Sequence, residues 1–539
     1  MKKRLLNLIV ITLTFTTIVT LGQVSPVGSS NTSAPPDLGY TSQLIVYKNE
    51  VYFGGDYVNG NELLKVNSND NLIYQFKDIN SGYRNSSPDN FFVSSVTNEL
   101  FFAANGSNTH FNKELWKSDG TVSGTIEAAD FNNSISKGTF PNNIAEVNNK
   151  LIMSVESLNQ GVEVGVYNTT TGNKSIIDVY NLGNGSHSNP EDFYNFNGKI
   201  YFSAFTNIHK RELYATDGTA SGTQMIKDIN TNSSSVGSSD PKHFTAFNNK
   251  VYFSAKNGVD GNELWVTDGT TAGTNLVKDI NTNGSSNPEN FLVFGNRLYF
   301  TATSDSNGTE LYYMSSNESV VQYKDINPGA ASSNPSDLFV FKGKLYFSAD
   351  NGTNGEELWR ADGSIFGIGL FKDINTSGNS SPKFPIVYND KMYFVADDGA
   401  TGRELWATDG TSAGTTLVAD INSTGSSEPI SFVVANELLF FHADNGFKRR
   451  LWMYQDPVLS TKNFDKNNVQ IYPNPIKNSF KLNHINDIKS LSIFDITGKK
   501  VKIFDTNQIE YNISELSKGI YFLEIEGENS YEKVKIIKE

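Results

Sequence analysis

Cysteine is absent from the 539 residues of this chain. Its absence excludes disulfide bonds, thiolate metal sites, thiol nucleophiles and a lipid-anchored N-terminal cysteine. Histidine is scarce, and its six copies show no paired ligand spacing such as His-x-x-x-His. Neither a Gly-x-Ser-x-Gly elbow nor a phosphate-binding loop occurs. The sequence thus offers no catalytic, metal-ligating or cofactor-binding residue, and we predict that the protein is not an enzyme.

Long apolar runs are also lacking, with one exception at the start of the chain. There Lys2, Lys3 and Arg4 precede an apolar run from Leu5 to about Val19, and small residues follow. This pattern predicts a secretory signal peptide over 1–22, with cleavage between Gly22 and Gln23. The run is short of the roughly 20 apolar residues that span a bilayer. We therefore expect a mature protein without a transmembrane segment.

Positive charge is in deficit, since the formal net charge is -14. A field of this sign repels phosphate backbones. Nucleic acid is accordingly not expected as a partner.

What the chain does contain is a repeat. Pro288, Pro335, Pro382 and Pro429 stand at a constant interval of 47 residues. A fixed period of this length indicates one supersecondary unit used many times. Alignment on an aromatic or apolar doublet gives nine copies: Tyr52-Phe53, Phe101-Phe102, Ile152-Met153, Tyr201-Phe202, Tyr252-Phe253, Tyr299-Phe300, Tyr346-Phe347, Tyr393-Phe394 and Phe440-Phe441.

Each copy divides into four short strands. The first two meet at a two-residue hairpin signal, as at Lys342-Gly343. The last two meet across a Thr-Asp-Gly-Thr turn, clearest at Thr267–Thr274 and Thr408–Thr415. We therefore predict an all-β fold, a β-propeller of about nine (alternatively eight) four-stranded blades over 23–454. A parallel β-helix is the rival, but it lacks hairpins inside each unit.

The ninth copy stops after Met453 and lacks its fourth strand. A ring needs this strand to be complete. The stretch Gln23–Pro36 could supply it.

The conspicuous residues of the repeat have two interpretations. The five tryptophans share one repeat position, where Tyr214, Tyr312 and Leu64 stand in other copies. Such exchange favours burial over carbohydrate stacking. Repeated carboxylates likewise favour a structural role, because a general acid and its base need different environments. The carboxylates are Glu62, Glu114, Glu212, Glu263, Glu310, Glu357 and Glu404 in the third strand, and Asp78, Asp228, Asp279, Asp325, Asp373 and Asp420 in the fourth.

Any binding site should lie on the longer loops, which share one side of such a sheet array, or in its central channel. His110, His187, His209 and the pair Tyr83-Arg84 break the repeat on these loops. The loops Asp305–Glu310 and Asp350–Glu357 place oxygen atoms at the tight spacing of calcium loops. Calcium is thus a conceivable ligand, although Asx turns have the same composition.

The repeat resembles the ELWxxDGT-repeat family over about residues 40–455. The motif stands here as Glu263–Thr270 and Glu404–Thr411, with near matches at Glu114–Thr121 and Glu212–Thr219. The resemblance implies a secreted propeller and carries no established activity. The third copy departs from the motif at Gly165 and Asn168, so we expect an irregular blade there.

The repeat ends before a linker at 455–466 and a small domain at 467–539, which we predict to be an immunoglobulin-like β-sandwich. Val469–Pro475, Ile493–Val501 and Ile513–Leu523 resemble the type A C-terminal sorting domain of the type IX secretion system. The motif residues are Tyr472, Pro473, Asn474, Pro475, Gly498, Lys499, Gly519 and Tyr521. The resemblance implies handling by the type IX machinery and delivery to the cell surface or the medium.

These observations predict a secreted or cell-surface repeat protein that binds an unknown glycan or protein without catalysis. The alternative is a secreted hydrolase or lyase acting on polysaccharide. Two carboxylates that break the repeat and face each other at the axis would favour this alternative.

Overall fold

The computed structural model describes residues 23–30, 43–82, 84–106, 113–134, 137–181, 185–231, 237–364, 366–456, 470–483, 488–495, 499–505, 508, 510–527 and 531–539. These residues form strands, turns and bends, and no helix occurs among them. None of the described residues therefore belongs to a helix that could cross a membrane. They fall into two compact units, one over Gln23–Gln455 and one within Asp456–Glu539.

The described residues of the larger unit form nine sheets, which we number in chain order; all pairings are antiparallel except that of β2 with β6 in sheet one. Sheet one comprises β2 (Gly28–Ser29), β3 (Ile45–Tyr47), β4 (Glu50–Tyr57), β5 (Gly60–Val66) and β6 (Leu72–Lys77). Sheet two comprises β7 (Asp89–Val93), β8 (Leu100–Asn105), β9 (Lys113–Ser118) and β10 (Ile126–Ala129), and sheet three β11 (Asn142–Val147), β12 (Lys150–Ser157), β13 (Gly161–Asn168) and β14 (Lys174–Ile177). Sheet four comprises β15 (Glu191–Phe196), β16 (Lys199–Thr206), β17 (Lys210–Thr216) and β18 (Gln224–Lys227), and sheet five β19 (Lys242–Phe247), β20 (Lys250–Lys256), β21 (Asn262–Thr267) and β22 (Asn275–Lys278).

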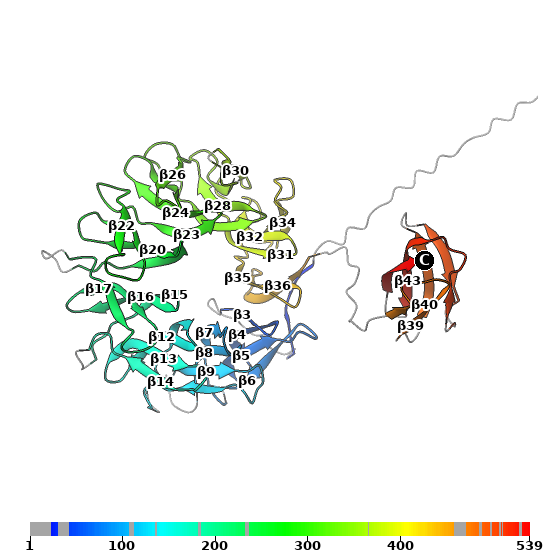
Figure 1. Ribbon diagram of the computed structural model, residues 1–539, viewed down its shortest axis with the longest axis horizontal. Helices are drawn as coiled ribbons and strands as arrows, with labels where there is room; N and C mark the ends of the chain where they lie inside the picture. The colour runs from blue at the N-terminus through cyan, green and yellow to red at the C-terminus, as the bar shows by residue number, and fades with distance from the viewer. Residues whose placement is uncertain are drawn as a thin grey trace, which may run out of the picture. The chain divides into compact units, whose positions relative to one another are not determined.

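The remaining sheets repeat this plan. Sheet six comprises β23 (Glu289–Phe294), β24 (Arg297–Ser304), β25 (Gly308–Ser315) and β26 (Val320–Lys324), and sheet seven β27 (Ser336–Phe341), β28 (Lys344–Asp350), β29 (Glu356–Ala361) and β30 (Ile368–Lys372). Sheet eight comprises β31 (Lys383–Tyr388), β32 (Lys391–Asp397), β33 (Arg403–Thr408) and β34 (Thr416–Ala419), and sheet nine β35 (Ile430–Ala435), β36 (Leu438–Asp444), β37 (Arg449–Gln455) and β1 (Gln23–Pro26). The sheets stand side by side around a central opening, with the first strand of each repeat innermost (Figure 1).

Turn chemistry explains the hairpins as predicted. Lys342 and Gly343 both have positive φ, 46° and 68°, the combination that a two-residue type I′ turn needs. In the second turn, the Asp268 carboxylate accepts hydrogen bonds from the backbone N–H and the hydroxyl of Thr270 at 2.9 and 2.7 Å. The turns between strands one and two and between strands three and four lie on one side of the array, which we call the turn side. The loops between strands two and three and between sheets define the opposite loop side.

The aromatic doublet holds neighbouring sheets together. Successive residues of a strand point to opposite faces of its sheet. Phe300 accordingly packs with sheet five, through Tyr252 and Val266, while Tyr299 packs with sheet seven, through Phe347 and Trp359. Each sheet is thus covered on both faces by its neighbours.

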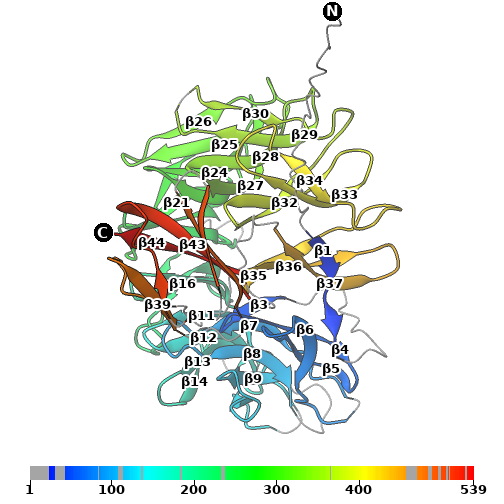
Figure 2. The same ribbon diagram turned by 90° about the vertical axis from the view of Figure 1, so that its right-hand side faces the viewer.

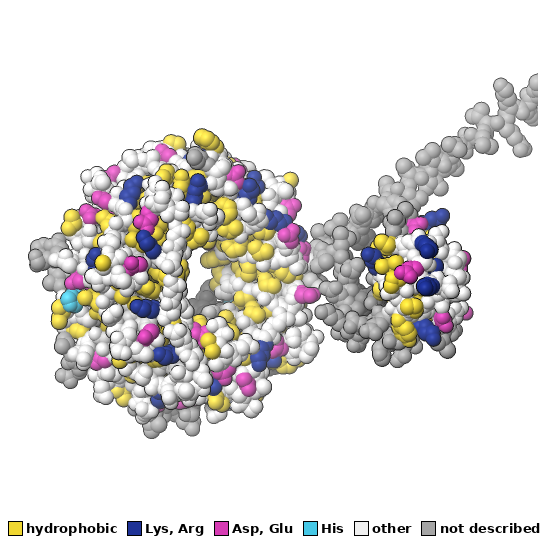
Figure 3. Space-filling model, in the orientation of Figure 1, with side chains coloured by type: hydrophobic (Ala, Val, Ile, Leu, Met, Phe, Trp, Pro, Cys, Tyr) yellow, Lys and Arg dark blue, Asp and Glu magenta, His cyan; other side chains and the backbone are white. Residues whose placement is uncertain are grey.

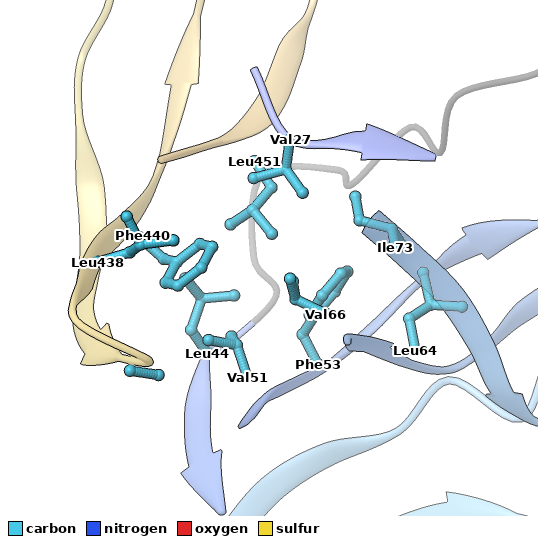
Figure 4. Packing of buried hydrophobic residues seen from close by; sticks show 11 residues of the cluster. Val27, Leu44, Val51, Phe53, Leu64, Val66, Ile73, Leu438, Phe440 and Leu451 are labelled. Carbon is cyan, nitrogen blue, oxygen red and sulfur yellow. The ribbon is translucent and has the colours of Figure 1, made fainter. Parts of the chain in front are cut away.

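Sheet nine receives its fourth strand from the N-terminal part of the larger unit, as the sequence predicted. Gln23 to Pro26 pair antiparallel with Gln455 to Trp452 (Figure 2). Next to this strand, Val27 and Leu451 belong to a core shared with Phe53 and Ile73 of sheet one, and Figure 4 shows that core. The adjoining β2 then pairs in parallel with β6 on the outer edge of sheet one.

Sheet three differs from other sheets at the position where the motif is lost, as expected. Its β13 and β14 pair without the register shift that sheets one, two and four to eight show between their third and fourth strands, for example between Leu264 and Trp265. Gly165 stands at the tryptophan position, and an added Cβ there would lie 2.6 Å from a methyl carbon of Val155. Val155 occupies a position that is alanine in neighbouring sheets, such as Ala204 and Ala255. The larger valine fills the space that the missing tryptophan leaves.

The smaller unit has two sheets. One contains β38 (Gln470–Tyr472), β39 (Ser479–Asn483) and β42 (Tyr511–Asn512), and the other β41 (Lys500–Phe504), β40 (Ile488–Asp495), β43 (Gly519–Gly527) and β44 (Tyr531–Lys538). Side chains of both sheets, including Phe480, Ile493 and Leu523, form one buried core. The proposed linker falls mostly on 457–469, and the signal peptide on 1–22, both outside the described residues.

Candidate functional site

The repeated glutamates are buried at the same place in eight sheets. Each opens the third strand and is inaccessible to solvent or nearly so. Glu163 is the eighth member, which the sequence interpretation missed because Gly165 and Asn168 hide the motif around it. The sequence does contain a signal for Glu163 in its partner, Ser188. Ser188 stands two residues before Pro190, just as Ser286, the partner of Glu263, stands two residues before Pro288.

Each glutamate binds the loop that leads to the next sheet. The Glu263 carboxylate accepts hydrogen bonds from the backbone N–H of Ile280 at 2.8 Å, and from the N–H and hydroxyl of Ser286 at 2.6 and 2.5 Å. Glu163 binds Val179 and Ser188 in the same way. These carboxylates satisfy backbone donors that would otherwise be buried without a partner. The scaffold thus occupies their oxygen atoms, except for one oxygen of Glu114, which has no hydrogen-bond partner among the described residues.

Burial also changes how the glutamates titrate. Desolvation raises the pKa of Glu62, Glu163 and Glu212 to about 7 each, and that of Glu114 to about 8. It raises the pKa of the other four in the same direction: Glu263, Glu310, Glu357 and Glu404. A perturbed pKa is often a sign of a catalytic acid. Here the perturbation occurs in eight equivalent places, so it reflects the scaffold.

The other repeated residues are structural too. All five tryptophans are at least nine-tenths buried, which confirms burial over stacking: Trp116, Trp265, Trp359, Trp406 and Trp452. The six aspartates predicted in the fourth strand lie directly after it. Several of them bond the loop between strands two and three, as where Asn354 donates to Asp373 at 2.7 Å.

The loops considered for calcium use their oxygen atoms internally. The Asp350 carboxylate accepts a hydrogen bond from the N–H of Gly352, and the Asn351 side-chain oxygen accepts two from Thr353 and Asn354. No group of three or more acidic or histidine side chains suited to a metal ion occurs within the described parts of the chain.

The loop residues that break the repeat form hydrogen bonds with different partners and not with one another. His187 accepts a hydrogen bond from the N–H of Val162 at 2.9 Å, whereas His209 pairs with Asp228 at 2.8 Å. In sheet seven the equivalent bond to the aspartate after the fourth strand is made by an asparagine, Asn354. Arg84 is exposed. His110 and Tyr83 lie outside the described residues.

The innermost strands carry an apolar surface that the sequence interpretation did not single out. Five residues after the repeat proline, and at the matching register in β3, stand six valines: Val46, Val93, Val293, Val340, Val387 and Val434. We call them the valine arc. Val293, Val340 and Val387 are 41, 37 and 43 % exposed. Glu146, Asn195 and Ala246 hold the position in sheets three to five. Figure 3 shows hydrophobic side chains along part of the wall of the opening.

In the smaller unit, the Tyr-Pro-Asn-Pro segment is exposed and bound to the last strand. The Asn474 side chain donates to the carbonyl of Lys535 at 3.2 Å and accepts from the N–H of Ile537 at 2.9 Å. Ile476, next along the chain, bonds the backbone of Ile537 and Glu539. The segment is thereby fixed beside the C-terminal residues.

A surface depression of about 550 Å³ adjoins this segment. Its walls include Tyr472, Pro473, Pro475, Lys481 and Glu539. Of the other motif residues, Lys499 is exposed and its N–H donates to Asp495 at 3.0 Å, and the Tyr521 hydroxyl donates to Ser517 at 2.9 Å. Gly519 begins β43, and Gly498 lies outside the described residues.

Comparison with known proteins agrees with the geometry of the smaller unit. Residues 470–539 match the family model of the secretion system C-terminal sorting domain. Among curated proteins, no sequence relative of the chain is found.

Several solved structures are similar over most of the chain at low identity. One is the extracellular domain of a one-component system from B. thetaiotaomicron, at 10 % identity and a TM-score of 0.30, covering 93 % of this chain and 81 % of that one. Another is PorZ, described as an essential bacterial surface component of the type IX secretion system of Porphyromonas gingivalis, at 10 % identity and a TM-score of 0.27, covering 93 % and 86 %. A third is a prolyl endopeptidase, at 9 % identity and a TM-score of 0.36, covering 72 % and 54 %. At these scores the likenesses carry no argument about activity. The chain carries a type IX secretion C-terminal sorting domain at residues 470–539, and it is a secreted or cell-surface protein.

Proposed function

We propose that the protein is a non-enzymatic binding module that the type IX machinery exports through its C-terminal domain. In this proposal the nine sheets are the blades of a closed β-propeller built from ELWxxDGT-type repeats, and the smaller unit is an immunoglobulin-like sandwich. The ligand is a glycan or another surface protein.

The observation that carries the proposal is how the repeated carboxylates are bonded. An acid and base pair needs two carboxyl groups in unlike environments. The eight buried glutamates stand at equivalent places, and each accepts a hydrogen bond from a Ser or Thr hydroxyl of the next loop, as at Glu263 and Glu114. The inner wall carries the partly exposed valine arc, and binding surfaces tend to be apolar at their centre.

The test is a screen of the mature chain, 23–539, against polysaccharides and candidate surface proteins, with binding and product release measured on the same samples. We expect binding without products, unchanged by EDTA because the loop oxygens are already bonded. Release of soluble oligosaccharides would instead establish the alternative, a polysaccharide hydrolase or lyase.

The exposed Tyr472–Pro475 segment supports the export part of the proposal. Asn474→Ala removes both side-chain bonds to β44 and should reduce the amount of protein in the medium or at the cell surface. Ile503→Thr serves as the control outside the motif residues, since the side chain of Ile503 is 67 % exposed. Equal export of wild type and the Asn474 variant would contradict a role of this segment.

A further inference from the structure

One backbone position of the inner wall is left-handed in eight sheets. Two residues after the repeat proline, φ lies between 52 and 60°. Asparagine and aspartate adopt this conformation most readily, because their short polar side chains bond locally. The eight residues are Asn90, Asn143, Asp192, His243, Asn290, Asp337, Phe384 and Ser431.

Phe384 is the exception in this set. Its φ is 57°, and its side chain is 47 % exposed. A bulky side chain in this region costs on the order of 1 kcal/mol or more. Burial does not offset that cost, because nearly half of the ring remains in water. An outlier of this kind is a reason to look for a binding role.

The backbone of Phe384 is bound to a carboxylate that could orient a ligand. The N–H of Phe384 donates to one oxygen of Asp337 on the neighbouring β27 at 3.1 Å, and the Ser336 hydroxyl donates to the other at 3.1 Å. Each carboxylate oxygen has a further lone pair for a ligand hydroxyl. Lys383 and Asp337 border the same small cavity between sheets seven and eight. Val340 and Val387 of the valine arc stand three residues beyond Asp337 and Phe384 on the same two strands.

The geometry points to a neutral saccharide at this place: we propose that the Phe384 ring is a stacking platform for a pyranose, that Asp337 and Lys383 bond its hydroxyls, and that Val340 and Val387 extend the apolar contact. The inference rests on the proposed function as a binding module and names its site and ligand class. Sugar rings present C–H groups on their faces and hydroxyls at their rims, which match an exposed aromatic ring beside polar side chains.

Two observations favour a neutral saccharide over other ligands. The adjoining cavity measures about 10 Å³, room for one water molecule, so an anchoring side chain of a protein partner could not enter it. The net charge of -14 disfavours anionic polysaccharides.

The experiment measures affinity and thermal stability together, with the mature chain and soluble β-glucan, xylan and mannan as probes. Phe384→Asn restores the residue type that this backbone favours. We expect it to weaken binding at least tenfold while the melting temperature stays equal or rises. Phe384→Trp should keep the affinity, and Asp337→Ala should lower it severalfold.

Phe140→Asn is the matched control. Phe140 also has positive φ, 46°, and is 44 % exposed, but it precedes its repeat proline on a loop rather than following it on an inner strand. We expect that variant to bind like wild type.

Wild-type binding that Phe384→Asn leaves intact would overturn this site while the proposed function stands. Failure of the wild type to bind any of the three probes would overturn the saccharide assignment. Product release would overturn the proposed function itself, and is read separately from binding.

Discussion

Sheets three and nine both depart from the repeat, yet they do so differently. Sheet three lacks the tryptophan but keeps its glutamate, Glu163, with the full set of bonds to Val179 and Ser188. Sheet nine keeps Trp452 but has Arg450 where Glu404 stands in sheet eight, opposite Ala443 as Glu404 is opposite Ala396.

The difference shows what the repeated carboxylate is for. In sheets one to eight, the chain leaves the fourth strand through a loop that enters the next sheet, and the glutamate binds that loop. In sheet nine the fourth strand is β1, and the chain after β1 forms β2 on sheet one instead. With no such loop to bind, the carboxylate would be a buried charge without donors. The tryptophan position, by contrast, can be refilled by a neighbour such as Val155.

The strongest test of sheet nine removes its borrowed strand. Deleting 23–29 removes one of the two strands that pair with β37 and takes Val27 out of the core with Phe53 and Leu451. We expect loss of cooperative unfolding, or destabilisation by more than about 4 kcal/mol, measured by thermal and urea denaturation. Val259→Asp, at an 81 % exposed loop tip, should change stability by less than about 0.5 kcal/mol. A stable deletion variant would show that β1 contributes little to the stability of sheet nine.

Removal of the repeated carboxylate should lower the stability more than the equivalent change in sheet nine, which has no such carboxylate. Glu263→Ala leaves the N–H groups of Ile280 and Ser286 buried without acceptors, which should cost about 3 kcal/mol. Arg450→Ala, the equivalent change in sheet nine, should cost less than about 1 kcal/mol. Equal losses in urea denaturation would refute the role assigned to the loop.

Sheet three offers a double-mutant cycle. Gly165→Ala places a Cβ 2.6 Å from Val155, and overpacking of this kind costs about 2 kcal/mol. Val155→Ala alone leaves a void and should cost a similar amount. The double variant should be more stable than the sum predicts, because each change relieves the other. Simple additivity would mean that the two positions do not share the space.

The smallest expected effect is the pH dependence of the glutamates. A carboxyl group whose pKa is higher in the folded than in the unfolded protein binds more protons when folded. The stability that this adds is fully present at pH values below the unfolded pKa, and it is lost as the pH rises through the folded pKa. The ordinary value is 4.5, and burial raises it to about 7 in Glu62 and about 8 in Glu114. The melting temperature should therefore fall by a few degrees between pH 5 and 8.5. Glu263→Gln should reduce this slope, and a slope of opposite sign would contradict the proton uptake.

The sequence predicted the features that follow from spacing and local turn chemistry. The four strands of each copy, the turn at Lys342-Gly343, the burial of the tryptophans and the strand from Gln23 onward are all confirmed. In the smaller unit the predicted strands are present, whereas β38 and the two-residue β42 are too short to show a pattern.

Other features depend on the folded backbone and could not be predicted. The left-handed conformation of Phe384 follows from a register shift between Lys383 and Ile386, which the sequence does not reveal. The parallel pairing of Gly28 and Ser29 with β6 involves two residues without periodicity. In sheet three, the packing around Gly165 depends on Val155, which is ten residues away along the chain.

The pairing of β1 with β37 has a consequence for the order of events during biosynthesis. The first strand of the larger unit emerges before every other strand, yet its partner, Arg449–Gln455, emerges last. For the whole time in between, β1 has no place in the fold. A chain that stops before Arg449 lacks the strand with which β1 pairs. Sheet nine can therefore be completed only when the whole of the larger unit is present.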